Sequence, residues 1–189
     1  MVTLKQIRLS DALPVIAFGA CIALMVTNIQ LHRRNAELNR QIDNLEASDA
    51  PVLGSHISVL AGTNLDGKAI TLDLSHRNSS TLLFILSPSC AHCARTLPTW
   101  KAMMDVIGAD HVVIGDLSGS LNRSYLKGAK MDSISNILHL NVEEGLLHGL
   151  RATPTTILLS KDGTVNLAWA GEMDGATVAT FRRALLSTR

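Results

Sequence analysis

The stretch that decides the fold is LLFILSPSCAHC, residues 82–93. Its five leading apolar residues predict a buried strand, and the apolar pattern that follows Cys93 has the period of a helix. Cys90 therefore falls at the start of a helix, where unpaired N–H groups and the positive dipole end favour a thiolate. Two thiols at this spacing can close a small disulfide ring or help to bind zinc, so the surrounding sequence has to decide.

The rest of the chain after residue 52 alternates predicted strands and helices. The strands are expected at 57–60, 69–72, 81–86, 111–116, 136–140, 155–159 and 165–169, and the helices at 91–107, 122–130, 142–150 and 174–186. The sequence KDGT at 161–164 is a hairpin signal between the last two strands. This order predicts an α/β domain with a mixed sheet over residues 52–189.

The N-terminal part is different in character. Residues 13–31 are almost uninterruptedly apolar and uncharged, and a helix of that length reaches roughly 28 Å, close to the thickness of a bilayer core. We therefore predict that residues 1–31 form a signal anchor with a transmembrane helix, because a cleaved signal peptide has a shorter apolar region. Lys5 and Arg8 on one side, and Arg33 and Arg34 on the other, leave the orientation open.

Residues 32–51 are predicted to form a helical stalk and a linker. Apolar positions and one asparagine follow a four–three spacing, namely Leu31, Asn35, Leu38, Ile42 and Leu45. This seam covers only two heptads, so a homodimer through residues 31–45 and a stalk that packs on the membrane or the domain are both open. Cys21 is either an ordinary apolar residue of the anchor or a site of lipid attachment.

Composition narrows the classes of function. Hydrophobic residues make up 47% of the chain, which is enough to form a hydrophobic core. The formal net charge is only +1, so no polyanion partner is implied. Aromatic residues are only 3%, which argues against a nucleic-acid platform, and no nucleic-acid partner is expected. Three cysteines and seven scattered histidines give no second ligand pair for zinc. We expect no metal and no cofactor beyond a redox-active Cys90–Cys93 disulfide.

The cysteine pair, the strand before it, the helix after it and Thr153-Pro154 before a later strand together resemble the thioredoxin fold. The nearest resemblance is to membrane-anchored TlpA- and ResA-like thiol–disulfide oxidoreductases and their MauD-like relatives. It covers residues 52–189 and is carried by the motifs at 87–93, 97–98, 150–156 and 161–163. The resemblance implies a thioredoxin-like mixed sheet flanked by helices.

The resemblance also implies a role for each motif residue. Cys90 would be the exposed nucleophile, Cys93 the buried resolving thiol, and Pro154 a cis proline facing the pair, while the backbone of Thr153 would pair with an extended substrate. The implied protein is a single-pass inner-membrane oxidoreductase with a periplasmic domain. Its partners would be client proteins with thiols or disulfides, such as cytochrome c assembly factors or an amine dehydrogenase subunit, and an upstream membrane thiol carrier.

His92 bears on the redox direction. A protonated imidazole beside the Cys90 thiolate lowers the pKa of that thiol, favours the reduced form and makes the protein a better oxidant. We therefore predict a reduction potential less negative than that of thioredoxin. An alternative function is a copper metallochaperone or a partner-binding adaptor, since thiolates are good ligands for Cu(I).

Two further predictions concern the surroundings of the pair. The strand at 82–86 contains no carboxylate, so it supplies no buried acid beneath Cys93. Glu143 and Glu144 are interpreted as a solvated pair, and Trp100 and Trp169 as core residues.

Overall fold

The computed structural model describes residues 19, 21–36 and 50–187. The chain divides into two compact units, Met1–Asn44 and Leu45–Arg189. In the first unit, residues 19 and 21–36 are helical. No helix within these described ranges combines the length and the apolar character that crossing a bilayer requires. The predicted anchor at 13–31 and the predicted seam at 31–45 lie partly outside the described residues, and both stay predictions.

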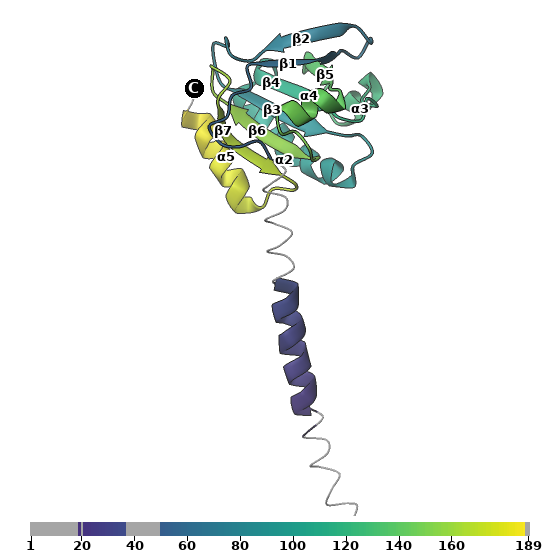
Figure 1. The fold of residues 1–189 in the computed structure, drawn as a ribbon, viewed down its shortest axis with the longest axis vertical. Coiled ribbons are helices and arrows are strands. Elements are labelled where there is room, and N and C mark those ends of the chain that lie inside the picture. The colour runs from purple at the N-terminus through teal and green to yellow at the C-terminus, as the bar shows by residue number, and fades with distance from the viewer. Residues whose placement is uncertain (1–18, 20, 37–49, 188–189) are drawn as a thin grey trace, which may run out of the picture. The chain divides into compact units, whose positions relative to one another are not determined.

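A seven-stranded mixed sheet forms the centre of the second unit (Figure 1). Its strands are β1 (Val59–Thr63), β2 (Ala69–Asp73), β3 (Thr81–Leu86), β4 (Val112–Asp116), β5 (Asn136–His139), β6 (Thr155–Leu159) and β7 (Val165–Ala170), in the order β2-β1-β5-β4-β3-β6-β7. Strand β3 runs parallel to β4 and antiparallel to β6, and all of its residues are buried. A strand covered on both faces reads as a continuous apolar run, which explains the sequence LLFIL.

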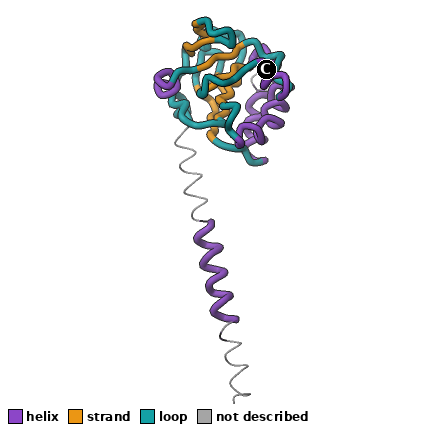
Figure 2. Tube along the Cα trace, turned by 90° about the vertical axis from the view of Figure 1, so that its right-hand side faces the viewer, coloured by secondary structure: helices purple, strands orange, loops and turns teal. Residues whose placement is uncertain are grey.

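Helices cover both sides of this sheet (Figure 2). They are α2 (Ala91–Ile107), α3 (Arg123–Gly128), α4 (Val142–Leu147) and α5 (Gly175–Ser187), with a short 3-10 turn at Ala109–His111. Residues Leu82, Phe84 and Leu86 of β3 join a core with α2, α3 and α5, and Leu83 and Ile85 join a second core on the opposite face. The alternation of side chains along a strand therefore builds two separate apolar layers.

Trp100 of α2 occupies the larger of these cores. Its ring stacks on Phe84 with a centroid distance of 4.7 Å, and its indole N–H donates to the Thr156 hydroxyl at 2.6 Å. The indole is fully buried and its one polar group is satisfied, which is what a buried tryptophan requires. The prediction that Trp100 is a core residue is confirmed.

The predicted elements agree with the structure, with differences at their ends. Strands β3 and β6 and helix α2 have the predicted bounds, and α2 continues past Pro98. Helices α3 and α4 are shorter than predicted. The side chains of Asn122 and Asn141 accept hydrogen bonds from the first turns, and α4 ends before Gly149, whose φ is +70°. Asparagine caps and a left-handed glycine limit helices in this way.

Candidate active site

The fold brings two distant motifs to the same edge of the sheet. Strand β3 ends at Leu86, and α2 begins at Ala91 after a short turn. Because β6 is antiparallel to β3, with Thr155 opposite Ile85, the residues just before β6 lie beside the end of β3. The Thr153-Pro154 peptide bond there is cis, as the resemblance implied.

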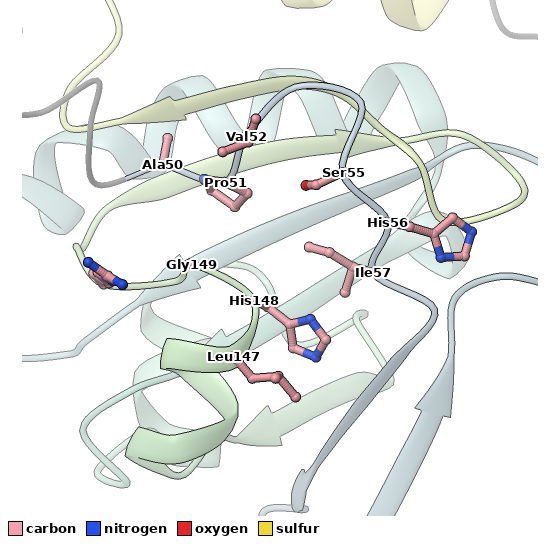
Figure 3. Close-up of a pocket in the computed structure, with 10 residues that line it drawn as sticks. Ala50, Pro51, Val52, Ser55, His56, Ile57, Leu147, His148 and Gly149 are labelled. Carbon is pink, nitrogen blue, oxygen red and sulfur yellow. The ribbon is translucent and has the colours of Figure 1, made fainter.

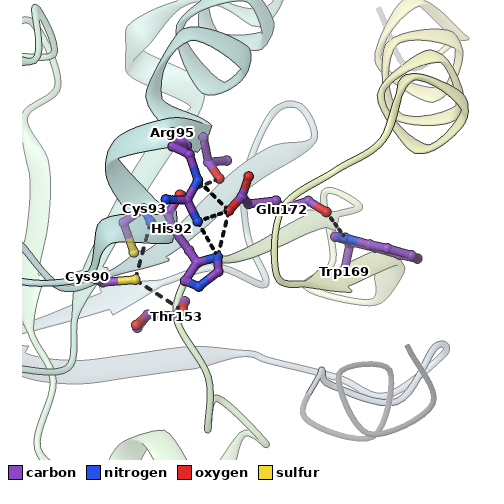
Figure 4. Close-up of polar contacts among 8 residues, drawn as sticks. Cys90, His92, Cys93, Arg95, Thr153, Trp169 and Glu172 are labelled. Carbon is purple, nitrogen blue, oxygen red and sulfur yellow. Dashed lines mark hydrogen bonds and ion pairs between the residues drawn. The ribbon is translucent and has the colours of Figure 1, made fainter. Parts of the chain in front are cut away.

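Cys90 is the N-cap of α2 and its sulfur lies between the two motifs (Figure 4). The Cys93 amide donates to Cys90 Sγ at 3.2 Å, and the Cys90 thiol donates to the Thr153 carbonyl, 63 positions later in the chain, at 3.4 Å. Both thiols are free; Cys90 is half-buried and Cys93 is buried. The structure therefore gathers Cys90, Cys93 and the Thr153-Pro154 loop in one place.

The two sulfurs have opposite acidities. Burial opposes ionisation of Cys90, but hydrogen bonds from the side chain and amide of Cys93, from Thr153 and from the His92 amide hold its pKa below the usual value. Burial, reinforced by the neighbouring Cys90 sulfur, raises the pKa of Cys93 to about 12. A thiolate is the reactive form of cysteine, so this site activates the outer sulfur and keeps the inner one protonated.

His92 meets different partners from those predicted. Its Nδ1 lies 2.6 Å from Glu172 Oε1 and 2.9 Å from Arg95 Nη2. The part of His92 that lowers the pKa of Cys90 is its backbone N–H. The direct action of the imidazole on the thiolate, on which the sequence argument for redox direction rested, is not among the contacts of the described residues. That prediction of redox potential stays untested.

Two residues of the site had escaped the sequence argument. Arg95 follows His92 by three positions on one helix, a spacing that brings side chains together and could have pointed to it. Glu172 follows β7 and lies 80 positions from His92, and no local pattern marks it. Trp169, predicted as core, is half-buried and packs against the larger core. Its indole N–H donates to the Glu172 carbonyl at 3.1 Å.

A buried carboxylate lies on the neighbouring strand. Asp116 ends β4 directly opposite Leu86 of β3, and its side chain is fully buried. It accepts hydrogen bonds from Ser118, from the Leu121 amide at 2.8 Å and from His139 Nδ1 at 2.9 Å. Burial pushes the pKa of Asp116 up, but these hydrogen bonds outweigh it and hold the pKa below the usual value.

Asp116 and the two cysteines all influence the pKa of one side chain, that of Tyr125. Burial, and then electrostatic interactions with Cys93, Cys90 and Asp116, raise the pKa of Tyr125. The tyrosine hydroxyl is buried without a hydrogen-bond partner. The absence of an acid from 82–86 therefore did not mean that the vicinity of the pair lacks one.

The prediction for the α4 glutamates is half wrong. Glu143 is exposed, but Glu144 is half-buried and accepts a hydrogen bond from the Ala61 amide of β1 at 2.7 Å. His148 lies 3.4 Å from the same carboxylate. Because α4 contacts β1, Glu144 pairs with a strand amide rather than with water.

We expect Asp116→Ala to lower the free energy of unfolding by roughly 2–4 kcal/mol, because it strips a hydrogen-bond acceptor from several buried donors. Urea unfolding of the full chain in detergent, followed by tryptophan fluorescence, measures this. Since the folded pKa lies below the ordinary 3.8, the contribution is full at neutral pH and fades as the pH falls below 3.8. Asp105→Ala, at an exposed position of α2, serves as the control; an equal loss there would contradict the assignment.

A pocket of about 300 Å³ has neither cysteine of the pair in its lining (Figure 3). The segment from Ala50 to Ile57 and the loop from Leu147 to Arg151 line it, and it includes His56 and His148. Within the described part of the chain, no three His, Cys, Asp or Glu side chains gather to hold a metal ion.

We compared the sequence with those of known proteins. No family model matches the sequence. The chain is 28% identical over 154 residues to the methylamine utilization protein MauD of Methylobacillus flagellatus, a match that covers 79% of this chain and 72% of that protein. The MauD of Methylophilus methylotrophus is 25% identical over 154 residues, with 79% and 70% covered.

Solved structures show the same fold at low identity. A thiol:disulfide interchange protein from Bacteroides sp. matches with a TM-score of 0.51 and 17% identity, covering 72% of this chain and 91% of that one. A DsbF homologue from Corynebacterium diphtheriae matches with a TM-score of 0.52 and 15% identity, covering 69% and 86%. The thioredoxin-like fold predicted from the sequence is confirmed.

Proposed function

We propose that this chain, a MauD-like thiol–disulfide oxidoreductase with a thioredoxin fold, exchanges disulfides with extracytoplasmic client proteins while it is tethered to a membrane. The observation that carries the proposal is the contrast between the two sulfurs. Cys90 is half-buried at a helix N-terminus with a lowered pKa, and Cys93 is buried with a raised one. The Cys90 sulfur is therefore suited to attack a client, and the Cys93 sulfur stays protonated until it resolves the mixed disulfide.

The reaction follows from this contrast. The Cys90 thiolate attacks a client disulfide, the client S–S bond breaks, a mixed disulfide forms, and the released client sulfur takes up a proton. Cys93 then loses its proton and attacks the Cys90 sulfur, which releases the second client thiol. The client gains two electrons and the chain is left with a Cys90–Cys93 disulfide. The same steps in reverse oxidise a client dithiol.

The loop before β6 is suited to hold the client during these steps. Cys90 Sγ lies 3.4 Å from the Thr153 carbonyl, so a client sulfur bonded to Cys90 would lie next to the Thr153 backbone. An extended client segment pairing with that backbone would position its disulfide for attack. Pro154 follows directly, and its side chain is buried.

The location of the reaction is inferred from the N-terminal sequence. The uncharged apolar run at 13–31 supports a single-pass membrane anchor. The charges on either side of this run leave its orientation open, so the inner membrane and a periplasmic domain are inferred from the resemblance to membrane-anchored thiol–disulfide oxidoreductases. A tethered domain works on clients near the membrane and needs a membrane thiol carrier to restore its redox state. The name of the relatives, methylamine utilization protein, favours an amine dehydrogenase subunit over cytochrome c assembly factors as the client.

Trapping clients in cells tests the proposal. In a Cys21→Ser background, which removes the exposed third thiol, we expect full-length Cys93→Ser to accumulate mixed disulfides with extracytoplasmic proteins in the membrane fraction, because no second thiol remains to release them. Non-reducing electrophoresis and mass spectrometry identify the trapped proteins. The matched control, Cys90→Ser with Cys93→Ser, should trap none. Trapping of cytosolic proteins only, or equal trapping by the control, would overturn the proposal.

A further inference from the structure

We infer that Glu172, in the loop between β7 and α5, is a positioning residue that sets the redox balance of the Cys90–Cys93 pair by gathering His92 and Arg95 on one carboxylate oxygen. The inference rests on the proposed function and adds a residue that the motif does not contain. Its effect is to moderate the oxidising power of the pair.

The carboxylate is built into the site from two sides. Glu172 Oε1 lies 2.6 Å from His92 Nδ1, 2.6 Å from Arg95 Nη2 and 2.8 Å from Arg95 Nε (Figure 4). Both of these partners belong to the first turns of α2, next to the cysteines. On the other side, the Trp169 indole N–H donates to the Glu172 carbonyl and so fixes the backbone of the loop.

This arrangement also determines the state of the imidazole. An ionised carboxylate can only accept hydrogen bonds, so His92 Nδ1 must carry the hydrogen that it shares with Glu172. Nδ1 then cannot accept from Arg95, and the 2.9 Å approach of Arg95 Nη2 places two donors side by side. The carboxylate oxygen between them holds this pair together.

The cluster adjusts the charge near the reactive sulfur. Arg95 is a permanent cation. Its hydrogen bond and charge interaction with Glu172, and after these a smaller charge interaction with Cys90, raise the pKa of its guanidinium. A cation near Cys90 stabilises the thiolate and hence the reduced pair, whereas the anion Glu172 offsets that cation. The charged and titratable groups in this region are Arg95 and His92 from α2, Glu172 from the loop and the thiols of Cys90 and Cys93.

The sign of the effect follows from charge alone. Glu172→Gln keeps an oxygen that can accept from Arg95 but removes the negative charge, so the thiolate gains stability and the reduced form is favoured. A dithiol with a more stable reduced form is a stronger oxidant. Arg95→Gln removes the cation and should shift the balance in the opposite direction.

Redox equilibrium with glutathione tests the inference on the full-length chain in detergent, with reduced and oxidised forms separated after alkylation. We expect Glu172→Gln to shift the equilibrium constant about threefold to tenfold toward the reduced form, up to about 30 mV. Arg95→Gln should shift it toward the oxidised form. Glu143→Gln removes an exposed carboxylate from α4 and should leave it unchanged.

The outcomes separate this inference from the proposed function. A parent pair that fails to exchange with glutathione contradicts the proposed function itself. A parent that exchanges while Glu172→Gln equilibrates like the parent overturns only the role of Glu172. A shift of Glu172→Gln and Arg95→Gln in the same direction would also overturn it, because loss of loop structure rather than charge would then explain both. Circular dichroism of each variant checks that the fold is retained.

Discussion

Replacing Cys90 with Ser abolishes disulfide exchange, with turnover of a disulfide substrate falling by at least about a thousandfold to the uncatalysed rate. A serine hydroxyl is not ionised at neutral pH and cannot form a mixed disulfide. The Cys93 amide and the Thr153 carbonyl that surround Cys90 Sγ would still be present. Reduction of insulin disulfides by the full chain with dithiothreitol as the electron source measures the loss.

An aromatic disulfide that releases a coloured thiol separates the roles of the two cysteines. In a Cys21→Ser background, which removes the exposed third thiol, the reduced parent should release two equivalents. Cys93→Ser should release one and stay covalently bound to the other, while Cys90→Ser should release almost none in the same time. Release of two equivalents by Cys93→Ser, or of the full amount by Cys90→Ser, would contradict the roles assigned to the two cysteines.

The sequence was sufficient for the parts of this site that are encoded locally. The run LLFIL marks β3 because a strand buried on both faces has no polar interruptions. The cysteine that follows it becomes the N-cap because the apolar period of 91–107 begins immediately after it. The thioredoxin resemblance then placed Thr153-Pro154 beside the pair, a contact over 63 positions that no local pattern would reveal.

The charged groups around the cysteine pair could not be predicted from the sequence, because their positions depend on contacts between separate elements of the fold. Glu172 reaches His92 only after β7 is added at the edge of the sheet beside β6. Asp116 becomes a buried acid opposite Leu86 through the parallel pairing of β3 with β4. Glu144 looked solvated because its partner is a backbone amide of β1, 83 positions away. Each contact joins side chains whose sequence neighbours give no sign of the partner.

Alkylation at neutral pH discriminates strongly between the two thiols. We expect iodoacetamide to modify Cys90 at least about a hundredfold faster than Cys93 at pH 7, because a pKa of about 12 leaves roughly one Cys93 in 10⁵ as thiolate. Mass spectrometry of the Cys21→Ser chain, quenched at intervals, gives both rates. Equal rates, or faster modification of Cys93, would contradict the acidities on which the mechanism depends.

The pH dependence sharpens this prediction. The Cys90 rate should reach a plateau once the pH passes its lowered pKa, below 9.0, whereas the Cys93 rate should keep rising about tenfold per pH unit up to pH 10. Part of the high pKa of Cys93 comes from the charge and hydrogen bonding of Cys90. Cys90→Ala should therefore lower the pKa of Cys93 and speed its alkylation. Forming a mixed disulfide at Cys90 removes the same charge, so the resolving thiol ionises more readily only after a client has been captured.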